Sequence, residues 1–304
     1  MSPHWFHVQL TRILTVDWSG AGPGHARRLW VAEVHEGRLM SLRNGQTRDE
    51  VTARLVAITA RAHAAGERVL MGLDFAFGFP SWYLAARGWT SSVEAWTNFT
   101  PAAVHDVLAA PTFPFWGREP TRTRPTALRE ERDTPPSRAT ERSVRDIARP
   151  FSVFQLVGAG AVGVGSLRGM ATLAALHAAG AHVWPFTHDE GGSGVVVAEV
   201  WPRLAAPDVI KSNAASRREA LHTLATVLQC AASDVEAAAG SDDAFDALAA
   251  AAWLWQHRAQ LEQLPDDSTP EERREGRILG ARTPSLLHST MRGRRGPDSP
   301  GMGG

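Results

Sequence analysis

Apolar residues along the chain fall into short β-branched runs and longer helical patterns, which predicts a mixed α/β fold. The runs 13–16, 69–73 and 195–200 are predominantly apolar, as expected for strands that are buried on both faces of a sheet. Segments 29–34 and 38–42 are strand candidates joined by a tight turn, which favours antiparallel pairing. The pattern therefore predicts a sheet that starts with antiparallel strands and continues with parallel ones.

Helical periodicity appears between these strand candidates. Residues 49–65 place apolar side chains on one face of an amphipathic helix. Because this helix links two apolar strands, the strands are expected to pair in parallel. Later helices are predicted over 170–179 and from a cap at Ser212 or Asn213 to about 232. The glycine-rich run 158–169 is expected to be a turn, since each glycine costs a helix interior about 1 kcal/mol relative to alanine.

Carboxylates stand near the ends of three predicted strands. Asp17 and Asp74 directly follow apolar runs, and Glu199 lies near the end of a third. The carboxyl edge of an α/β sheet is where ligands usually bind, and a carboxylate buried there needs a cation or hydrogen bonds. Two alternatives stay open: Asp17 forms a turn with Ser19, and Glu199 pairs with an arginine such as Arg203.

A late helix carries the other candidate acids. Ser241 is a suitable N-cap, and acids in the first turn, such as Asp242 and Asp243, suit the helix dipole. Asp246 lies one turn deeper among alanine, leucine and tryptophan, on the same helix face as Asp243. Two carboxylates on a buried face repel each other unless a cation lies between them. This spacing favours a metal site.

Residues 80–150 form a long insertion after the fourth strand. Its first part is rich in aromatic residues and its second part in arginine. Prolines and mixed charges predict poor order between about 120 and 140. One interpretation is a lid or groove wall that stacks bases and neutralises phosphates. The other is a solvated insertion whose aromatic residues cover the sheet.

Composition restricts the class of protein. The 304 residues carry no formal net charge, which argues against a dedicated DNA-binding protein but allows an enzyme with a local basic groove. Lys211 is the single lysine, so nearly all positive charge is arginine, which favours bidentate contacts with phosphate or carboxylate. We expect one domain over 1–284 and a disordered tail over 285–304.

The same composition predicts a cytoplasmic protein without membrane contact. Cys230 is the single cysteine, so no internal disulfide forms and a reducing compartment fits. The N-terminus lacks the basic and apolar regions of a signal peptide. The uncharged run 151–167 is too short and too rich in glycine to span a membrane.

Five short motifs carry a family resemblance: VDWSGA at 16–21, GLDFAFGFP at 72–80, FQL at 154–156, EVWP at 199–202 and DAFDALA at 243–249. Together they resemble the domain-of-unknown-function-429 family, which is regarded as a predicted-nuclease branch of the ribonuclease H-like superfamily. The last motif resembles that of RuvC-type Holliday-junction resolvases. The resemblance covers roughly residues 12 to 280.

The resemblance implies a ribonuclease H-like mixed five-stranded sheet flanked by helices, with the long insertion after the fourth strand. It also implies a divalent-metal-dependent nuclease. Two Mg²⁺ (or Mn²⁺) ions about 4 Å apart would promote phosphodiester hydrolysis. The expected metal ligands and catalytic residues are Asp17, Asp74, Asp243 and Asp246, with Glu199 as a further catalytic candidate. Nucleic acid would be the partner, bound through the arginine-rich insertion.

Two other functions remain open from the sequence. An actin-like nucleotide-binding phosphotransferase shares the same core and places acids at similar strand ends, but normally has two such cores. A non-catalytic binding protein on the same fold would use the insertion alone. Binding of Mg²⁺ or Mn²⁺ that requires Asp17 and Asp74 would separate an enzyme from a scaffold.

Overall fold

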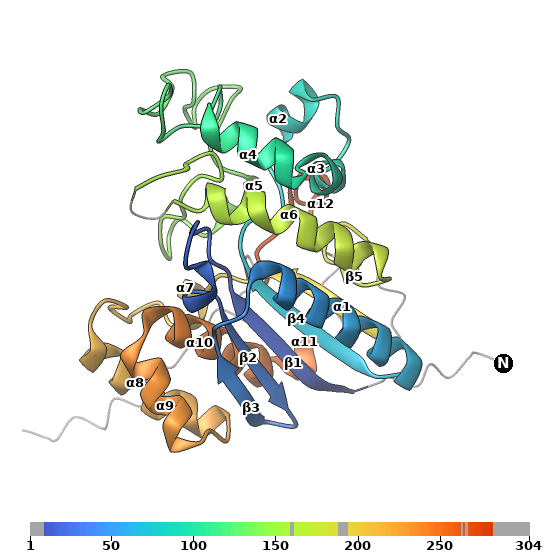
Figure 1. Cartoon of the computed structure of the whole chain (residues 1–304), viewed down its shortest axis with the longest axis vertical. Coiled ribbons are helices and arrows are strands. Elements are labelled where there is room, and N and C mark those ends of the chain that lie inside the picture. Colours follow the sequence, from blue (N-terminus) through green and yellow to red (C-terminus); the bar gives the residue numbers. More distant parts are fainter. Residues whose placement is uncertain (1–8, 159–160, 188–193, 263, 265–266, 282–304) are drawn as a thin grey trace, which may run out of the picture.

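A six-stranded mixed sheet lies at the centre of the computed structural model, which describes residues 9–158, 161–187, 194–262, 264 and 267–281 (Figure 1). The strands follow the order β3-β2-β1-β4-β6-β5. Strands β1 to β3 pair antiparallel, whereas β1, β4, β6 and β5 run parallel. Their bounds are β1 (Leu10–Asp17), β2 (Trp30–His35), β3 (Arg38–Arg43), β4 (Arg68–Asp74), β5 (His182–Val183) and β6 (Gly194–Glu199).

The antiparallel start and the parallel continuation agree with the prediction, but the strand count differs. The described sheet has six strands, where five were predicted. The strand beyond that count is β5, whose two residues pair with β6 at the edge of the sheet and lie inside the short strand that the sequence predicts over 181–186. Pro185 follows shortly after β5. Proline has no backbone N–H to donate, so it cannot extend a strand ladder.

Helices cover both faces of the sheet (Figure 1). On one face, α1 (Arg48–Ala65) packs beside α6 (Gly163–Ala178), and on the other α10 (Asp242–Gln256) packs on β1 and β2. Helix α1 begins at a capping box formed by Thr47 and Glu50, and Gly66 ends it with a φ of 66°. Only glycine adopts this left-handed conformation without steric cost.

The remaining helices are short or lie around this framework (Figure 1). Helices α8 and α9 lie beside α10; α8 begins at the predicted cap Asn213 but ends at Val227 rather than at about 232, where α9 begins. The bounds are η1 (His25–Arg27), α2 (Ser81–Ala86), α3 (Ser92–Asn98), α4 (Pro101–Ala109), α5 (Ala139–Ser143), α7 (Pro202–Ala205), α8 (Ala214–Val227), α9 (Ala232–Gly240), α11 (Arg258–Leu261) and α12 (Pro270–Glu275).

From Gly163 onward the glycine-rich run forms helix, so the prediction of a turn was wrong for residues 163–169. Helix α6 begins at Gly163, and two of its glycines, Gly163 and Gly169, meet neighbours that leave no space for a side chain. A Cβ on Gly163 would lie 2.5 Å from the carbonyl oxygen of Val153, and one on Gly169 would lie 2.4 Å from the ring of Phe75. Close packing against these groups offsets the low helix propensity of glycine.

The long insertion is packed against the domain at both ends. Its aromatic part contributes to a cluster in which the ring of Phe154 lies 5.3 Å from Tyr83 and 5.4 Å from Phe115. At the other end, Ser137 and Arg138 are buried, so the predicted poor order over 120–140 does not extend to these residues. The aromatic residues therefore cover the core, as the second interpretation of the insertion proposed.

Two further expectations concern the ends of the chain and membranes. The predicted disordered tail over 285–304 lies outside the described residues. None of the helices in the described part combines the length and the apolar character needed to cross a bilayer.

Candidate metal centre

Three aspartates meet at the carboxyl edge of the sheet. Asp17 and Asp74 end the neighbouring parallel strands β1 and β4 and are in register with each other. Asp246 joins them from α10, and one carboxylate oxygen from each of the three residues lies within 4.8 Å of the other two. The predicted convergence of Asp17 and Asp74 is thus confirmed, and Asp246 joins them as expected.

Local packing holds the three aspartates in place. The hydroxyl of Thr15 on β1 donates to the carbonyl of Ala247 at 2.7 Å, next to Asp246, and thereby joins the strand to α10. Trp18, which follows Asp17, packs against Phe75 with ring centroids 5.1 Å apart. Both loops that leave the aspartates are therefore fixed against the core.

Lys211 brings a cation to the aspartates, which the sequence analysis did not predict. Its ammonium donates to Oδ2 of Asp246. The other oxygen of Asp246, Oδ1, is buried and has no hydrogen-bond partner among the described residues. The one signal in the sequence was that Lys211 is the single lysine. Nothing in the local pattern places it opposite Asp246, 35 residues further along the chain.

Burial and mutual repulsion raise the pKa values of the three aspartates. Burial raises the pKa of Asp17 well above its usual range, and repulsion from Asp74 and Asp246 adds to this. Burial also raises the pKa of Asp74 to about 7, although the Lys211 ammonium acts in the opposite sense. The pKa of Asp246 is raised too, mainly by burial. One ammonium therefore does not balance three buried carboxylates.

Asp243 lies at the margin of the three aspartates. Burial, together with repulsion from Asp242 and Asp246, raises its pKa to about 6. It lines a cavity of about 640 Å³ together with Asp17. Among the described residues, however, the converging group consists of Asp17, Asp74 and Asp246 alone. Asp243 thus faces the same space without completing the group.

Glu199 is placed differently from the other candidates. Both of its oxygens accept hydrogen bonds from the buried guanidinium of Arg138, at 2.6 and 2.8 Å. One of them also accepts from the backbone N–H of Phe77 at 3.0 Å. The sequence-based alternative, in which Glu199 pairs with an arginine, is confirmed, but the arginine is Arg138 rather than Arg203. In this state Glu199 fixes the loop after β4.

The arrangement suits a hard divalent cation. Mg²⁺ and Mn²⁺ prefer carboxylate oxygens and retain several waters, and the cluster offers oxygens from three residues with one of them, Oδ1 of Asp246, unpartnered. A neighbouring cavity of about 270 Å³ is lined by Asp74, Lys211 and Trp18. The donor set therefore fits a divalent metal site that opens onto space for a small substrate group.

Comparisons with protein-family models, with curated proteins and with solved structures found no match to this chain. The resemblance to the domain-of-unknown-function-429 family therefore stays a prediction from its motifs. The functional argument depends on the geometry of the aspartates and of the cavities beside them.

Gly20 is expected to be essential for the loop that follows Asp17. A Cβ at Gly20 would lie 2.6 Å from the backbone nitrogen of Gly165 in α6, and backbone cannot move aside cheaply. Gly20→Ala should therefore lower the free energy of unfolding by about 1–3 kcal/mol, measured by urea unfolding. Gly22→Ala is the matched control, because a Cβ there meets nothing within 4 Å. Equal stability of the two variants would contradict this packing.

The metal-free protein is expected to lose stability as the pH rises from about 4 to about 7. Because the folded-state pKa values of Asp17, Asp74 and Asp243 are raised, the folded protein binds protons that the unfolded chain has already released. Their contribution is complete below the unfolded pKa near 4 and is lost as the pH passes the folded values. The charges of Lys211 and Asp246 also act on these three carboxyl groups: Lys211 lowers their pKa values and Asp246 raises them.

Thermal melts in EDTA at about pH 5 and about pH 8 measure this effect. The melting temperature should fall over this window, and the fall should be smaller in Asp74→Asn because one shifted carboxyl group is gone. Mn²⁺ should restore stability at the higher pH, since a cation binds the ionised carboxylates. A melting temperature that stays constant or rises would contradict the raised pKa values.

Proposed function

We propose that this protein is a divalent-metal-dependent phosphodiesterase, a nuclease in the broad sense, with its site at Asp17, Asp74 and Asp246. One observation carries the proposal: carboxylate oxygens from three separate segments come within 4.8 Å of one another. Burying mutually repelling carboxylates is unfavourable unless a cation compensates for it. Folding that keeps them together is best explained by a cation that binds there.

When bound, Mg²⁺ or Mn²⁺ would lower the pKa of a bound water and polarise a phosphoryl oxygen. Asp17, Asp74 and Asp246 would hold the metal, with Asp243 close enough to affect its charge balance. Lys211 orients Asp246 through its ion pair. Its ammonium also lines the cavity beside Asp74, where it would attract the negative charge of a phosphate group.

Neighbouring side chains shape the same cavity. Trp18 and Phe75 form an apolar wall that limits the access of water. Arg138 holds Glu199 and so fixes the loop that begins at Asp74. Phe151 lines the cavity while 48% of its surface stays exposed, which suits contact with an aromatic base. These groups would position a substrate rather than react with it.

The fold and the partner belong to the same proposal. The succession β1–β2–β3–α1–β4, with acids at the ends of β1 and β4 and on α10, supports a ribonuclease H-like fold. A nucleic acid would be the substrate, in a reducing, cytoplasmic setting that suits the single cysteine. The actin-like alternative normally requires two such cores, whereas the described residues form one sheet.

A direct test measures metal binding and hydrolysis together. Calorimetric titration of the purified chain with Mn²⁺ and Mg²⁺ should give saturable binding. The same protein, incubated with single-stranded DNA, duplex DNA and RNA, should cleave at least one of them with Mn²⁺ and none with EDTA. Absence of divalent binding at about pH 8, where the carboxylates are ionised, would refute the metal centre.

A further inference from the structure

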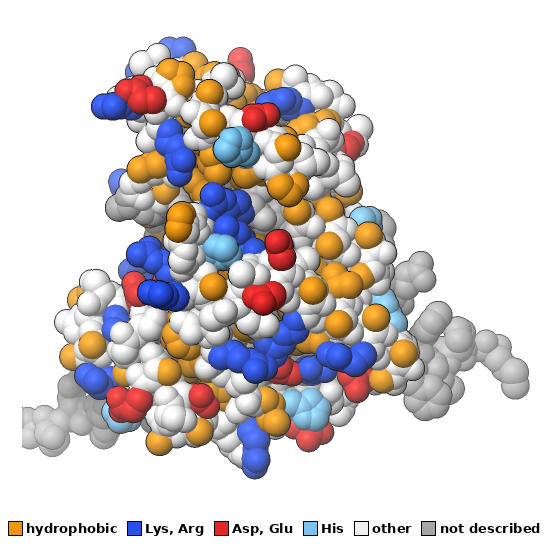
Figure 2. Space-filling model, viewed as in Figure 1, with side chains coloured by type: hydrophobic (Ala, Val, Ile, Leu, Met, Phe, Trp, Pro, Cys, Tyr) orange, Lys and Arg blue, Asp and Glu red, His pale blue; other side chains and the backbone are white. Residues whose placement is uncertain are grey.

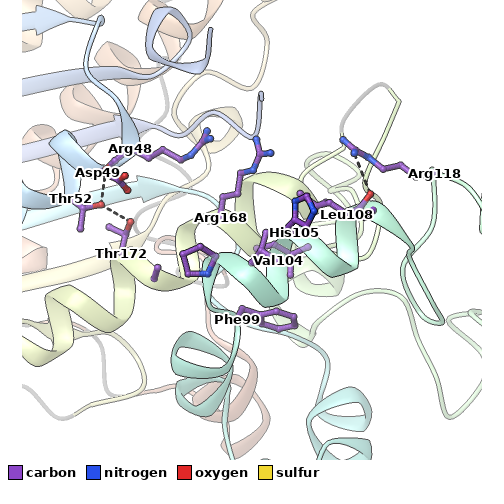
Figure 3. Close-up of a pocket in the computed structure, with 14 residues that line it drawn as sticks. Arg48, Asp49, Thr52, Phe99, Val104, His105, Leu108, Arg118, Arg168 and Thr172 are labelled. Carbon is purple, nitrogen blue, oxygen red and sulfur yellow. Dashed lines mark hydrogen bonds between the residues drawn. The ribbon is translucent and has the colours of Figure 1, made fainter. Parts of the chain in front are cut away.

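A third cavity, of about 520 Å³, is basic and shares Arg118 with the cavity that contains Asp17. Three arginines line it: Arg48 at the start of α1, Arg168 in α6 and Arg118 in the loop after α4. Figure 3 shows the guanidinium ends of Arg48 and Arg168 close to each other, with Arg118 on the far side of His105. We call this cavity, with Arg48, Arg118 and Arg168 in its lining, the arginine pocket. Figure 2 shows basic side chains gathered in a hollow on this face, near α4.

Two guanidinium groups of the arginine pocket meet at one backbone carbonyl. Arg48 donates through Nη1 to the oxygens of Ser19 at 2.8 Å and Ala21 at 3.1 Å. Arg168 donates through Nη1 to the oxygen of Gly20 at 2.8 Å and also to that of Ala21. Each guanidinium carries five donors, so both retain donors that are free for a ligand.

The positive charges of the arginine pocket are not neutralised by ion pairs. In the described part of the chain, none of the three arginines forms a salt bridge with a carboxylate. Asp49 also lines the cavity, but its single negative charge is smaller than the three positive charges of the arginines. Burial, and then repulsion from Arg168, lowers the pKa of Arg48 to about 10. Half-buried like charges of this kind favour binding of an anion.

The arginine pocket is connected to the aspartates by the loop 18–22. The cavity of about 640 Å³ that contains Asp17 and Asp243 is lined by this loop and also by Arg118, which lines the basic cavity too. A ligand that follows this surface passes from acidic to basic groups. A ligand that reaches both cavities needs one phosphate at the aspartates and another at the arginines, and the regularly spaced phosphates of a nucleic-acid strand meet this need.

We propose that the arginine pocket holds a backbone phosphate of a nucleic-acid strand whose reacting phosphodiester lies at the aspartates. This rests on the proposed function for the reacting end only. The planar guanidinium forks of Arg48 and Arg168 match phosphate oxygens in a bidentate manner. The pocket would thereby set the register of the strand relative to the metal centre.

Binding without catalysis tests the pocket. The probe is a fluorescent single-stranded DNA of about ten nucleotides, measured by anisotropy in EDTA. The double variant Arg48→Gln/Arg168→Gln should bind at least about tenfold more weakly, because two charge-assisted contacts are lost. Its affinity should also depend less steeply on salt. Arg218→Gln is the control, since Arg218 is exposed and far along the chain on α8, and it should bind like the parent.

Two further variants keep the test decisive. Arg118 is exposed, and within the described part of the chain its guanidinium donates one hydrogen bond, of 3.4 Å, to the carbonyl of Leu108, so Arg118→Gln should fold normally and still bind the strand more weakly. Asp246→Asn should bind the strand in EDTA at least as well as the parent, even if the metal proposal fails. Equal binding by the parent, the double variant and Arg118→Gln would overturn the arginine pocket.

The source of the phosphate is decided by competition. Inorganic phosphate and adenosine monophosphate should displace the labelled strand from the parent only at concentrations far above those of an unlabelled strand. Displacement by adenosine monophosphate at the same concentration as the unlabelled strand would overturn the role of a strand and assign the pocket to a single nucleotide.

Discussion

Asp246→Asn is expected to reduce the stabilisation of the protein by Mn²⁺ and to reduce divalent-dependent phosphodiesterase activity at least about a hundredfold. Asparagine keeps the size of the side chain but removes the charge that completes the three-aspartate group. Ligand binding stabilises the folded state through linkage, so a weaker site gives a smaller increase in melting temperature. Melts with and without Mn²⁺, together with cleavage assays, measure both effects.

The metal-free form of the same variant should be at least as stable as the parent. Because the pKa of Asp246 is raised despite its ion pair with Lys211, the folded state disfavours the charged form, and a neutral side chain removes that penalty. Asp242→Asn is the control, since Asp242 is exposed one turn earlier on α10. Equal Mn²⁺-induced shifts in Asp246→Asn and the parent would remove Asp246 from the set of ligands.

Lys211→Met is expected to destabilise the metal-free protein by about 2–4 kcal/mol at about pH 8. Removal of the ammonium leaves the carboxylates of Asp17, Asp74 and Asp246 without their internal cation. Because Lys211 stays partly exposed, with 29% of its side chain accessible, the loss should lie toward the lower end of the values for buried pairs. Urea unfolding in EDTA measures it.

Mn²⁺ should stabilise Lys211→Met more than it stabilises the parent, since it no longer competes with a tethered ammonium for Asp246. Lys211→Arg keeps the charge and serves as the control, with stability in EDTA close to that of the parent. If Lys211 also attracts the substrate phosphate, Lys211→Met should bind Mn²⁺ more tightly and yet cleave more slowly. A variant that is as stable as the parent in EDTA would show that the ion pair with Asp246 contributes nothing.

Much of the framework follows from local patterns in the sequence. The apolar runs and their turns predicted the antiparallel strands β1 to β3 and the parallel pairing of β1 with β4. Because strands in parallel register end at the same edge, the positions of Asp17 and Asp74 were predictable from sequence alone. Ser241 as an N-cap likewise fixed the start of α10 and the depth of Asp246 within it.

Other features depend on contacts between distant segments. The glycines of α6 predicted a turn because helix propensity includes only the local cost of glycine in a helix. In the folded protein, Val153 and Phe75 leave room only for glycine at positions 163 and 169. The partner of Glu199 is Arg138, 61 residues earlier in the chain. Arginine is common in the insertion, so no local pattern distinguishes the one that becomes buried.

Periodicity and caps within short segments are enough to predict the strand pattern, the parallel sheet edge and the aspartates that lie there. The charge balance around these aspartates depends instead on how the chain folds. Lys211 reaches Asp246, and Arg48 and Arg168 meet at Ala21, because folding brings separate helices and loops together. Charge interactions depend on distance and burial in space, which sequence spacing does not encode.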